Sequence, residues 1–327
     1  MKIRNLAITL LACCGLPAAT SMDYRYFVAG GTCAAISHGI TTPIDVIKTK
    51  IQANPQKFNK GMKEATLTIL KEDGPDALLG GLGPTVVGYG IEGAMKFGVY
   101  EICKPLFAAI FGEHNKPIAY LMASVAAGAV AALLLCPMEY TRIRMVTDPD
   151  YADQGLITGF PKLVKEEGLR QTFSGLWAML AKQVPYTFGK QVSFDVFAGI
   201  LYAFFSGMDE AKLKWFVSVT AAFLASLVAC IFSQPGDMIL TETYRPQEKK
   251  GMMNSKNKKA TKKSSSSPAD DRAIRAVVQK IYQRGGLNAF FTGTQARIVH
   301  VGMIITSQLV IYDMVKQMLG LPATGSH

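Results

Sequence analysis

The sequence has little of what a soluble enzyme uses for chemistry. Its 327 residues include only four histidines and six cysteines, and the cysteines form no C-x-x-C pair and no metal-binding spacing. Adjacent Cys13 and Cys14 do not make a disulfide framework. No G-x-S-x-G motif, phosphate-binding loop or His/Cys cluster occurs. An enzyme is therefore the least favoured class, and we expect no cofactor and no metal.

Charged residues are scarce as well. They make up 18% of the chain against 49% apolar residues, and the mean hydropathy is +0.20, as is typical of an integral membrane protein. Apolar windows long enough to cross a bilayer cover 26–52, 84–111, 117–146, 177–206, 213–243 and 295–319. The polar residues that interrupt them are Lys96, Lys182, Lys190, Arg297 and Gln308. Because such side chains are costly in lipid, we predict an all-α membrane protein whose six transmembrane helices surround a polar pathway.

A proline–acid–base signature recurs about every hundred residues. The copies are PIDVIK at 43–48, PMEYTR at 137–142 and PGDMIL at 235–240. Two further registers, each spaced by 94 and 118 residues, begin at Gly74, Gly168 and Gly286 and at Tyr100, Phe194 and Tyr312. Registers in phase indicate three copies of one supersecondary unit, and a proline inside a helix kinks it.

The repeats divide the chain. Their predicted boundaries are 22–112, 113–208 and 209–321, and short surface helices are expected near 60–72, 157–167 and 270–283. The third repeat is longer because 247–268 is inserted, a segment with seven lysines and one glutamate that we predict to be a disordered loop. A position near anionic lipid is favoured over a nucleic-acid role for this loop.

Residues 1–21 form a separate segment. Lys2 and Arg4 precede an apolar run from Leu6 to Leu16, which is typical of a secretory-type signal sequence rather than an Arg- and Ser-rich presequence. The alternative is an extended N-terminus without targeting value.

From Tyr24 to Leu321 the three registers resemble those of the mitochondrial carrier family, and within it the mitochondrial phosphate carriers. The stretches that carry the closer resemblance are 83–101, 136–139, 182–187 and 296–313. Like those carriers, the chain has no base at Leu240 or Ala198. The resemblance implies six helices in three pseudosymmetric repeats, short matrix-side surface helices and alternating access. It also implies the mitochondrial inner membrane; another organelle envelope, reached through the signal-like segment, is the alternative.

The resemblance implies two gates made of ion pairs. The matrix gate would consist of Asp45, Lys48, Glu139, Arg142 and Asp237. The cytoplasmic gate would consist of Glu101, Lys104, Asp195, Asp313 and Lys316. Each has three acids and two bases, so one acid in each needs another partner. Hydrated pairs contribute only about 0–1 kcal/mol, which suits a gate that opens in every cycle.

Equivalent positions in the repeats indicate a binding site. Lys96, Lys190 and Gln308 each stand four residues before an aromatic gate residue and should project into the cavity at one level. With Arg297 and Lys182 nearby, they would bind inorganic phosphate through charge-assisted hydrogen bonds. The alternatives are another small anion (sulfate, arsenate or a dicarboxylate) and a membrane adaptor that does not transport. We expect a monomer associated with anionic lipids such as cardiolipin, and no nucleic-acid partner.

Proton coupling is the least settled feature. The resemblance assigns it to His38, Asp45 and Glu139, but Gly128 stands where those carriers have an acid. Glu92, one turn from Lys96, is the expected substitute acid. A purely structural Glu92–Lys96 pair, a structural His38 and transport without protons remain open.

Overall fold

The computed structural model describes residues 24–112, 115–205, 210–245 and 270–319. The predictions for 1–21 and 247–268 fall outside these residues. Every regular element in the described part is helical and none is a strand, which confirms the all-α prediction.

A long helix covers each of the six apolar windows. These helices are α2 (Tyr24–Ala53), α4 (Leu82–Phe111), α5 (Lys116–Thr147), α8 (Leu176–Phe204), α9 (Glu210–Tyr244) and α11 (Thr294–Met318). The shortest has 25 residues and the longest 35, or about 37–52 Å against a hydrocarbon core of about 30 Å. By length and apolar composition, two described segments qualify as membrane spans, Lys116–Thr147 and Phe216–Tyr244. None of the other described long helices qualifies on both counts.

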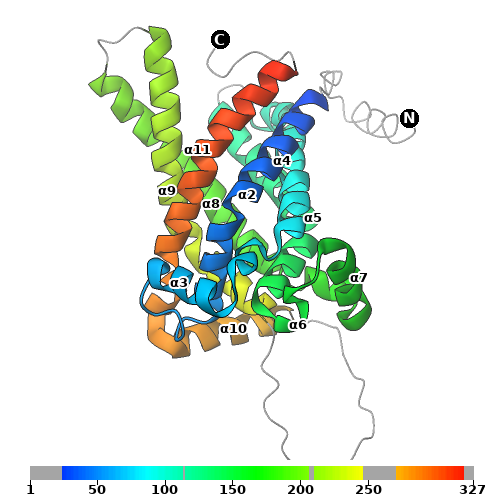
Figure 1. Ribbon diagram of the computed structural model, residues 1–327. Helices are drawn as coiled ribbons and strands as arrows, with labels where there is room; N and C mark the ends of the chain where they lie inside the picture. The colour runs from blue at the N-terminus through cyan, green and yellow to red at the C-terminus, as the bar shows by residue number, and fades with distance from the viewer. Residues whose placement is uncertain (1–23, 113–114, 206–209, 246–269, 320–327) are drawn as a thin grey trace, which may run out of the picture.

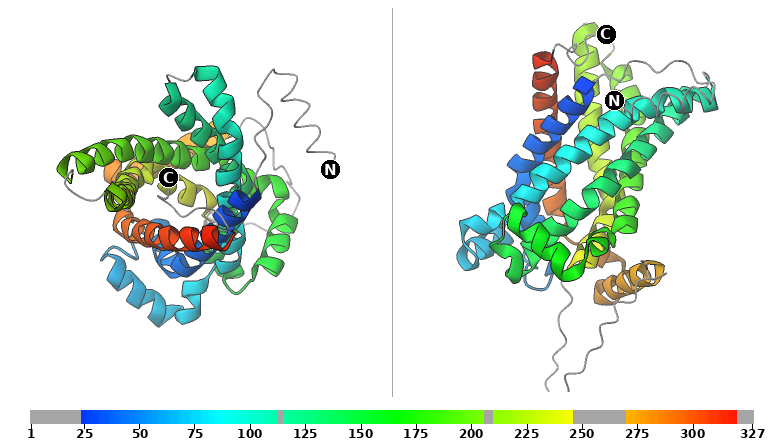
Figure 2. Two further views of the ribbon diagram at one scale, coloured as in Figure 1. Left: turned by 90° about the horizontal axis from the view of Figure 1, so that it is seen from above. Right: turned by 90° about the vertical axis from the view of Figure 1, so that its right-hand side faces the viewer.

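The long helices lie side by side and close into a ring (Figure 1). Each packs against its neighbour in the chain, and α11 returns to pack against α2. The view from above in Figure 2 shows the same ring along its axis. The described ends of the chain, the start of α2 and the end of α11, lie at the same end of the ring.

The opposite end carries the short elements and is called the short-helix end below (Figure 1). They are α3 (Met62–Glu72), α6 (Pro149–Ala152), α7 (Leu156–Glu167), α10 (Asp270–Gly285) and the 3₁₀ turns η1 (Pro75–Leu79), η3 (Leu169–Phe173) and η4 (Gly286–Phe291). The three predicted surface helices are confirmed as α3, α7 and α10. Gly74 and Gly168 precede η1 and η3 with φ of 83° and 89°, a conformation that glycine adopts without a Cβ clash, which explains the glycine register.

Most of the buried apolar contacts lie at the short-helix end. Ile69 of α3, Leu163 of α7 and Ile281 of α10 are buried in three separate clusters that fasten each short helix to the long ones. Elsewhere the long helices approach through small residues: a Cβ on Gly93 would lie 2.5 Å from the carbonyl oxygen of Gly30.

The outer surface of the ring is apolar. Ile40, Phe188 and Phe232, on three different long helices, each expose more than half of their surface. Isolated apolar residues are common on soluble proteins, but large ones on successive helices are what a lipid-facing surface requires. The fold thus has apolar side chains on the outside, whereas the charged residues are buried inside it near the short-helix end.

Candidate functional site

The acids and bases of the three signatures meet inside the ring, at the proline positions of α2, α5 and α9. Arg142 forms two bonds to Glu139, one of them 2.7 Å long between Nη2 and Oε1, and also pairs with Asp45 of α2. Lys48 Nζ lies 3.2 Å from Asp45 Oδ1 and 3.1 Å from Asp237 Oδ2 of α9. All five side chains are buried. This charge network therefore ties α2 to both α5 and α9.

The base missing from the third signature is replaced from another helix. Leu240 occupies that position and is buried in the apolar cluster of Tyr140 and Tyr244. Lys182 of α8 lies 3.0 Å from Asp237 Oδ1 and 4.0 Å from Glu139 Oε1, so it links α9 to α5. The structure places Lys182, a predicted phosphate ligand, in this part of the charge network.

Arg297, the other cation predicted near the substrate, also reaches the charge network. Its Nη1 is 3.6 Å from Asp237 Oδ2, and the guanidinium donates to the carbonyl oxygen and hydroxyl of Ser233 and to the side chain of Gln234. Gln52 of α2 also bonds to α9 here: its side-chain amide donates to Asp237 at 3.0 Å, and its side-chain oxygen accepts from Thr241. The network thus has three acids and four bases, and Asp237 has the partners that the signatures alone did not supply.

Two histidines lie beside the charge network. The ring of His38 stacks on Tyr89 with centroids 3.7 Å apart, and the Tyr89 hydroxyl donates to Glu139 at 3.4 Å. His300 of α11 lies edge-on to His38, with centroids 6.3 Å apart, and its Nδ1 is 3.4 Å from Asp45 Oδ1. His300 therefore contacts Asp45, an acid that the resemblance groups with His38 for proton coupling.

Lys96 and Lys190 lie inside the ring on different helices. Lys96 Nζ forms an ion pair of 2.6 Å with Glu92 Oε1, one turn earlier on α4. Lys190 of α8 has an exposed side chain. Gln308 of α11 is half-buried, and its carbonyl oxygen accepts from Cys33 of α2.

The opposite end of the ring is less connected. Glu101 is exposed, and Lys104 lies over the rings of Tyr100 and Tyr120, with Nζ 5.8 Å and 5.1 Å from their centroids. Among the side chains that the structure describes, neither Glu101 nor Lys104 forms an ion pair. The side chains of the other predicted gate residues, Asp195, Asp313 and Lys316, fall outside the described set.

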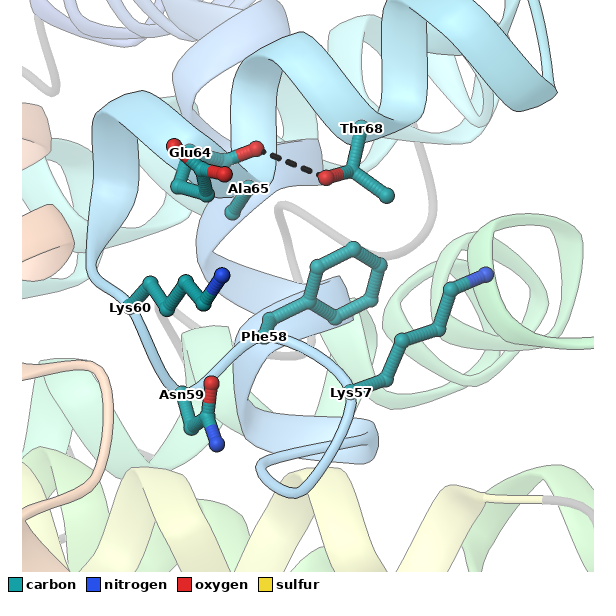
Figure 3. A pocket seen from close by; sticks show the side chains of 7 residues that line it. All are labelled: Lys57, Phe58, Asn59, Lys60, Glu64, Ala65 and Thr68. Atoms are coloured by element: carbon teal, nitrogen blue, oxygen red, sulfur yellow. Dashed lines mark hydrogen bonds between the residues drawn. The ribbon is translucent and has the colours of Figure 1, made fainter.

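One surface hollow lies away from these residues, beside the start of α3 (Figure 3). It is lined by Lys57, Phe58, Asn59, Lys60, Glu64, Ala65 and Thr68. Thr68 donates to the backbone oxygen of Glu64 within α3. None of the predicted site residues lines this hollow, so it carries no argument about transport.

The sequence reasoning missed His300, Gln52 and Tyr89. One signal was available for His300: it stands three residues after Arg297 and so shares a face of α11 with a residue already singled out. For Gln52 and Tyr89 no pattern distinguished them from other polar residues of the helices.

An apolar outer surface with buried charges, amides and histidines inside a helical ring defines the class of the protein, a helical membrane transporter. The family model described as mitochondrial carrier protein matches residues 21–110, 113–204 and 211–322. The chain belongs to the mitochondrial carrier family, whose members are carriers rather than enzymes.

Individual relatives match over nearly the full chain. Mitochondrial substrate carrier family protein N of Dictyostelium discoideum is 36% identical, with 92% of this chain and 96% of that protein covered. Mitochondrial phosphate carrier protein 2 of Arabidopsis thaliana is 33% identical, with coverage of 91% and 77%. Solute carrier family 25 member 3 of Homo sapiens is 32% identical, with coverage of 92% and 80%.

Proposed function

We propose that this protein transports inorganic phosphate across the mitochondrial inner membrane by alternating access, and that protons accompany the phosphate. As a member of the mitochondrial carrier family, it is a protein of that membrane. Several relatives similar to it over most of the chain are named mitochondrial phosphate carriers. No enzymatic step is part of this function.

The proposed arrangement has six transmembrane helices in three repeats, with the short-helix end facing the matrix. Three successive family matches, each containing two long helices and at least one short one, support the repeats. The helix lengths and the apolar outer surface support six crossings, including those of the long helices that do not qualify as spans by composition. A ring helix that contributes polar residues to an interior pathway need not be apolar along its whole length.

The observation that carries the substrate assignment is the pair Lys96 and Lys190. They stand at equivalent positions of the repeats on α4 and α8, each four residues before an aromatic gate residue. An anion between the two ammonium groups would accept charge-assisted hydrogen bonds from both. Gln308 would add an amide donor. Lys182 and Arg297 would form the floor of the site, where it meets the charge network.

The charge network would act as the matrix gate in its closed state. Phosphate would enter from the cytoplasmic side, neutralise the lysines and shift the balance towards opening of the network. The acids and bases of the opposite end, Glu101, Lys104, Asp195, Asp313 and Lys316, would then pair as the cytoplasmic gate.

Glu92 offers a physical basis for proton coupling. In the empty site it neutralises Lys96 at 2.6 Å. If Glu92 takes up a proton as phosphate arrives, Lys96 becomes free to bind the anion, so proton and phosphate binding favour each other. His38, which stacks on Tyr89, would pass protons towards Asp45 and Glu139.

Uptake of radiolabelled phosphate into liposomes containing the purified protein tests the substrate assignment. We expect Lys96→Ala to abolish uptake, whereas the exposed Lys165 on α7 provides a matched control in which Lys165→Ala transports like wild type. Uptake by Lys96→Ala at the wild-type rate would disprove the binding site. Competition by excess sulfate or a dicarboxylate stronger than that by phosphate would favour another anion as substrate, and no uptake of any anion would favour a membrane adaptor.

The proton assignment is tested in the same vesicles with a pH gradient. Wild-type uptake should increase when the outside is acidic, and Glu92→Gln, which cannot titrate, should lose this increase. Gradient-driven uptake that is unchanged in Glu92→Gln would remove Glu92 from the mechanism. Wild-type uptake indifferent to the gradient would exclude proton coupling.

A further inference from the structure

His300 joins α11 to two residues of α2. Its side chain is only 7% exposed, and the two ring nitrogens face different partners. Nδ1 lies 3.4 Å from Asp45 Oδ1, and Nε2 lies 3.2 Å from the hydroxyl oxygen of Thr41. A histidine with both nitrogens on polar partners at a gate residue is placed to titrate there.

Asp45 needs a donor at this position. Its Oδ1 is buried without a well-aligned hydrogen bond, although Lys48 Nζ lies 3.2 Å away. Its Oδ2 pairs with Arg142. A buried carboxylate oxygen without a donor is costly. A proton on His300 Nδ1 supplies this donor.

The hydroxyl of Thr41 determines how many protons the ring carries. This hydroxyl has one hydrogen, and it lies 3.0 Å from the carbonyl oxygen of Ser37. If Thr41 donates to Ser37, its oxygen can only accept from Nε2–H, and the ring is then protonated on both nitrogens. If the hydroxyl turns towards Nε2, a neutral ring makes the same contacts. The ring can therefore gain or lose a proton at Nε2 through rotation of one hydroxyl, and Asp45 keeps its donor in both states.

A proton added to His300 places a positive charge among several other charged groups. The charged and titratable groups around His300, from every element that contributes one, are His38, Asp45 and Lys48 of α2, Arg142 of α5, Asp237 of α9 and Arg297 of α11 itself. A cationic His300 competes with Arg142 for Asp45 and repels the neighbouring cations. The Asp45–Arg142 pair is the tie between α2 and α5, so protonation of His300 weakens the charge network there.

We propose that His300 is a proton-carrying residue of the transport cycle: it takes a proton at Nε2 while the charge network is closed, and the resulting cation favours opening of the network by competing for Asp45. The coupling to transport rests on the function proposed above. The edge-on ring of His38 is the nearest titratable group on the substrate side and would supply the proton. His300 on α11 would thus be a second proton-binding residue, in addition to Glu92 on α4.

A comparison of two transport modes distinguishes proton coupling by His300 from a purely structural role of this residue. Vesicles with the full-length protein are assayed for net phosphate uptake driven by a pH gradient and for phosphate/phosphate exchange at equal pH. His300→Gln keeps a donor and an acceptor but cannot titrate. We expect it to lower gradient-driven uptake about tenfold or more and exchange less than about twofold. An undiminished response to the gradient, or an equal loss in both modes, would overturn the proposal.

Titration of the ring is the second measurement and does not depend on phosphate. The chain has only four histidines, so the NMR signals of the His300 ring can be identified by their absence in His300→Gln. We expect the ring to gain a proton as the pH is lowered from about 8 to about 4, and to do so at lower pH in Thr41→Val because Nε2–H then loses its acceptor. Ser37→Ala is the matched control: its hydroxyl donates to Ala34 of its own helix and should leave the titration unchanged.

A His300 ring that stays in one protonation state over this range would overturn the inference whatever the protein transports. Wild-type vesicles that take up no phosphate would count against the proposed function instead, and the ring titration would still decide whether His300 binds a proton.

Discussion

The two ends of the helical ring differ in how their charged residues are partnered. At the short-helix end, Asp45, Arg142 and Asp237 are buried and have several charged partners each. At the opposite end, Glu101 is exposed and Lys104 contacts two aromatic rings. Loss of one partner from a buried pair costs about 3–5 kcal/mol, whereas an exposed pair contributes about 0–1 kcal/mol. The difference indicates which end of the ring is locked in this state: the short-helix end, through its charges and through the apolar clusters of α3, α7 and α10.

The largest effect is expected from Asp237→Asn, which removes the charge of an acid shared by three bases at the locked, short-helix end. The change leaves the buried Lys48 and Arg297 and the partly buried Lys182 beside one another without their shared acid. We expect a loss of stability of about 3–5 kcal/mol, measured as a lower unfolding temperature in detergent. Asp76→Asn, at an exposed position in η1, is the control. An unfolding temperature equal to that of the control would show that the charge network does not stabilise this state.

A smaller loss is expected from Lys182→Met, which removes the charge and keeps a side chain of similar length. Asp237 retains Lys48 and Arg297, and Glu139 retains Arg142, so no acid is left without a base. We expect about 1–2 kcal/mol from the lost charge-assisted bond, with Lys165→Met as the matched surface control. A loss as large as that of Asp237→Asn would mean that the α5–α9 link dominates the charge network.

The smallest effect is expected from Lys104→Met at the opposite end. The ammonium group of Lys104 contacts Tyr100 and Tyr120, and because all three side chains are only partly buried we expect this contact to contribute about 0.5–1 kcal/mol. The unfolding temperature should therefore change little. A decrease comparable to that of Asp237→Asn would remove the contrast between the two ends.

Much of the fold was predictable because its signals are local and repeated. Apolar windows of bilayer length gave all six long helices, and the glycine register marked the turns that precede η1 and η3. The signature at 43–48 also placed Asp45 and Lys48 one turn apart on a single helix face, as the structure has them. Such periodic features depend on neighbours in sequence, which a single chain displays directly.

The partners of Asp237 were harder to predict from the sequence. The absence of a base at Leu240 indicated that an acid lacked its partner, but Lys182 stands 55 residues away in the chain. The sequence predicts it as a phosphate ligand because it lies near Lys96, Lys190 and Gln308. Which of several cations approaches an acid depends on how the helices are rotated and bent in the ring, and no local pattern specifies that.

The family, the helices and the set of acids and bases inside them can all be read from the amino-acid sequence, because periodicity and spacing record which residues share a helix face. The pairing of those groups depends on the folded ring: Arg142 pairs with Asp45, Lys182 with Asp237, and His300 lies between Thr41 and Asp45. The physical reason is that a charge removed from water takes its partner from whichever helix lies within about 4 Å, and closure of the ring brings together residues as distant as Asp45 and His300.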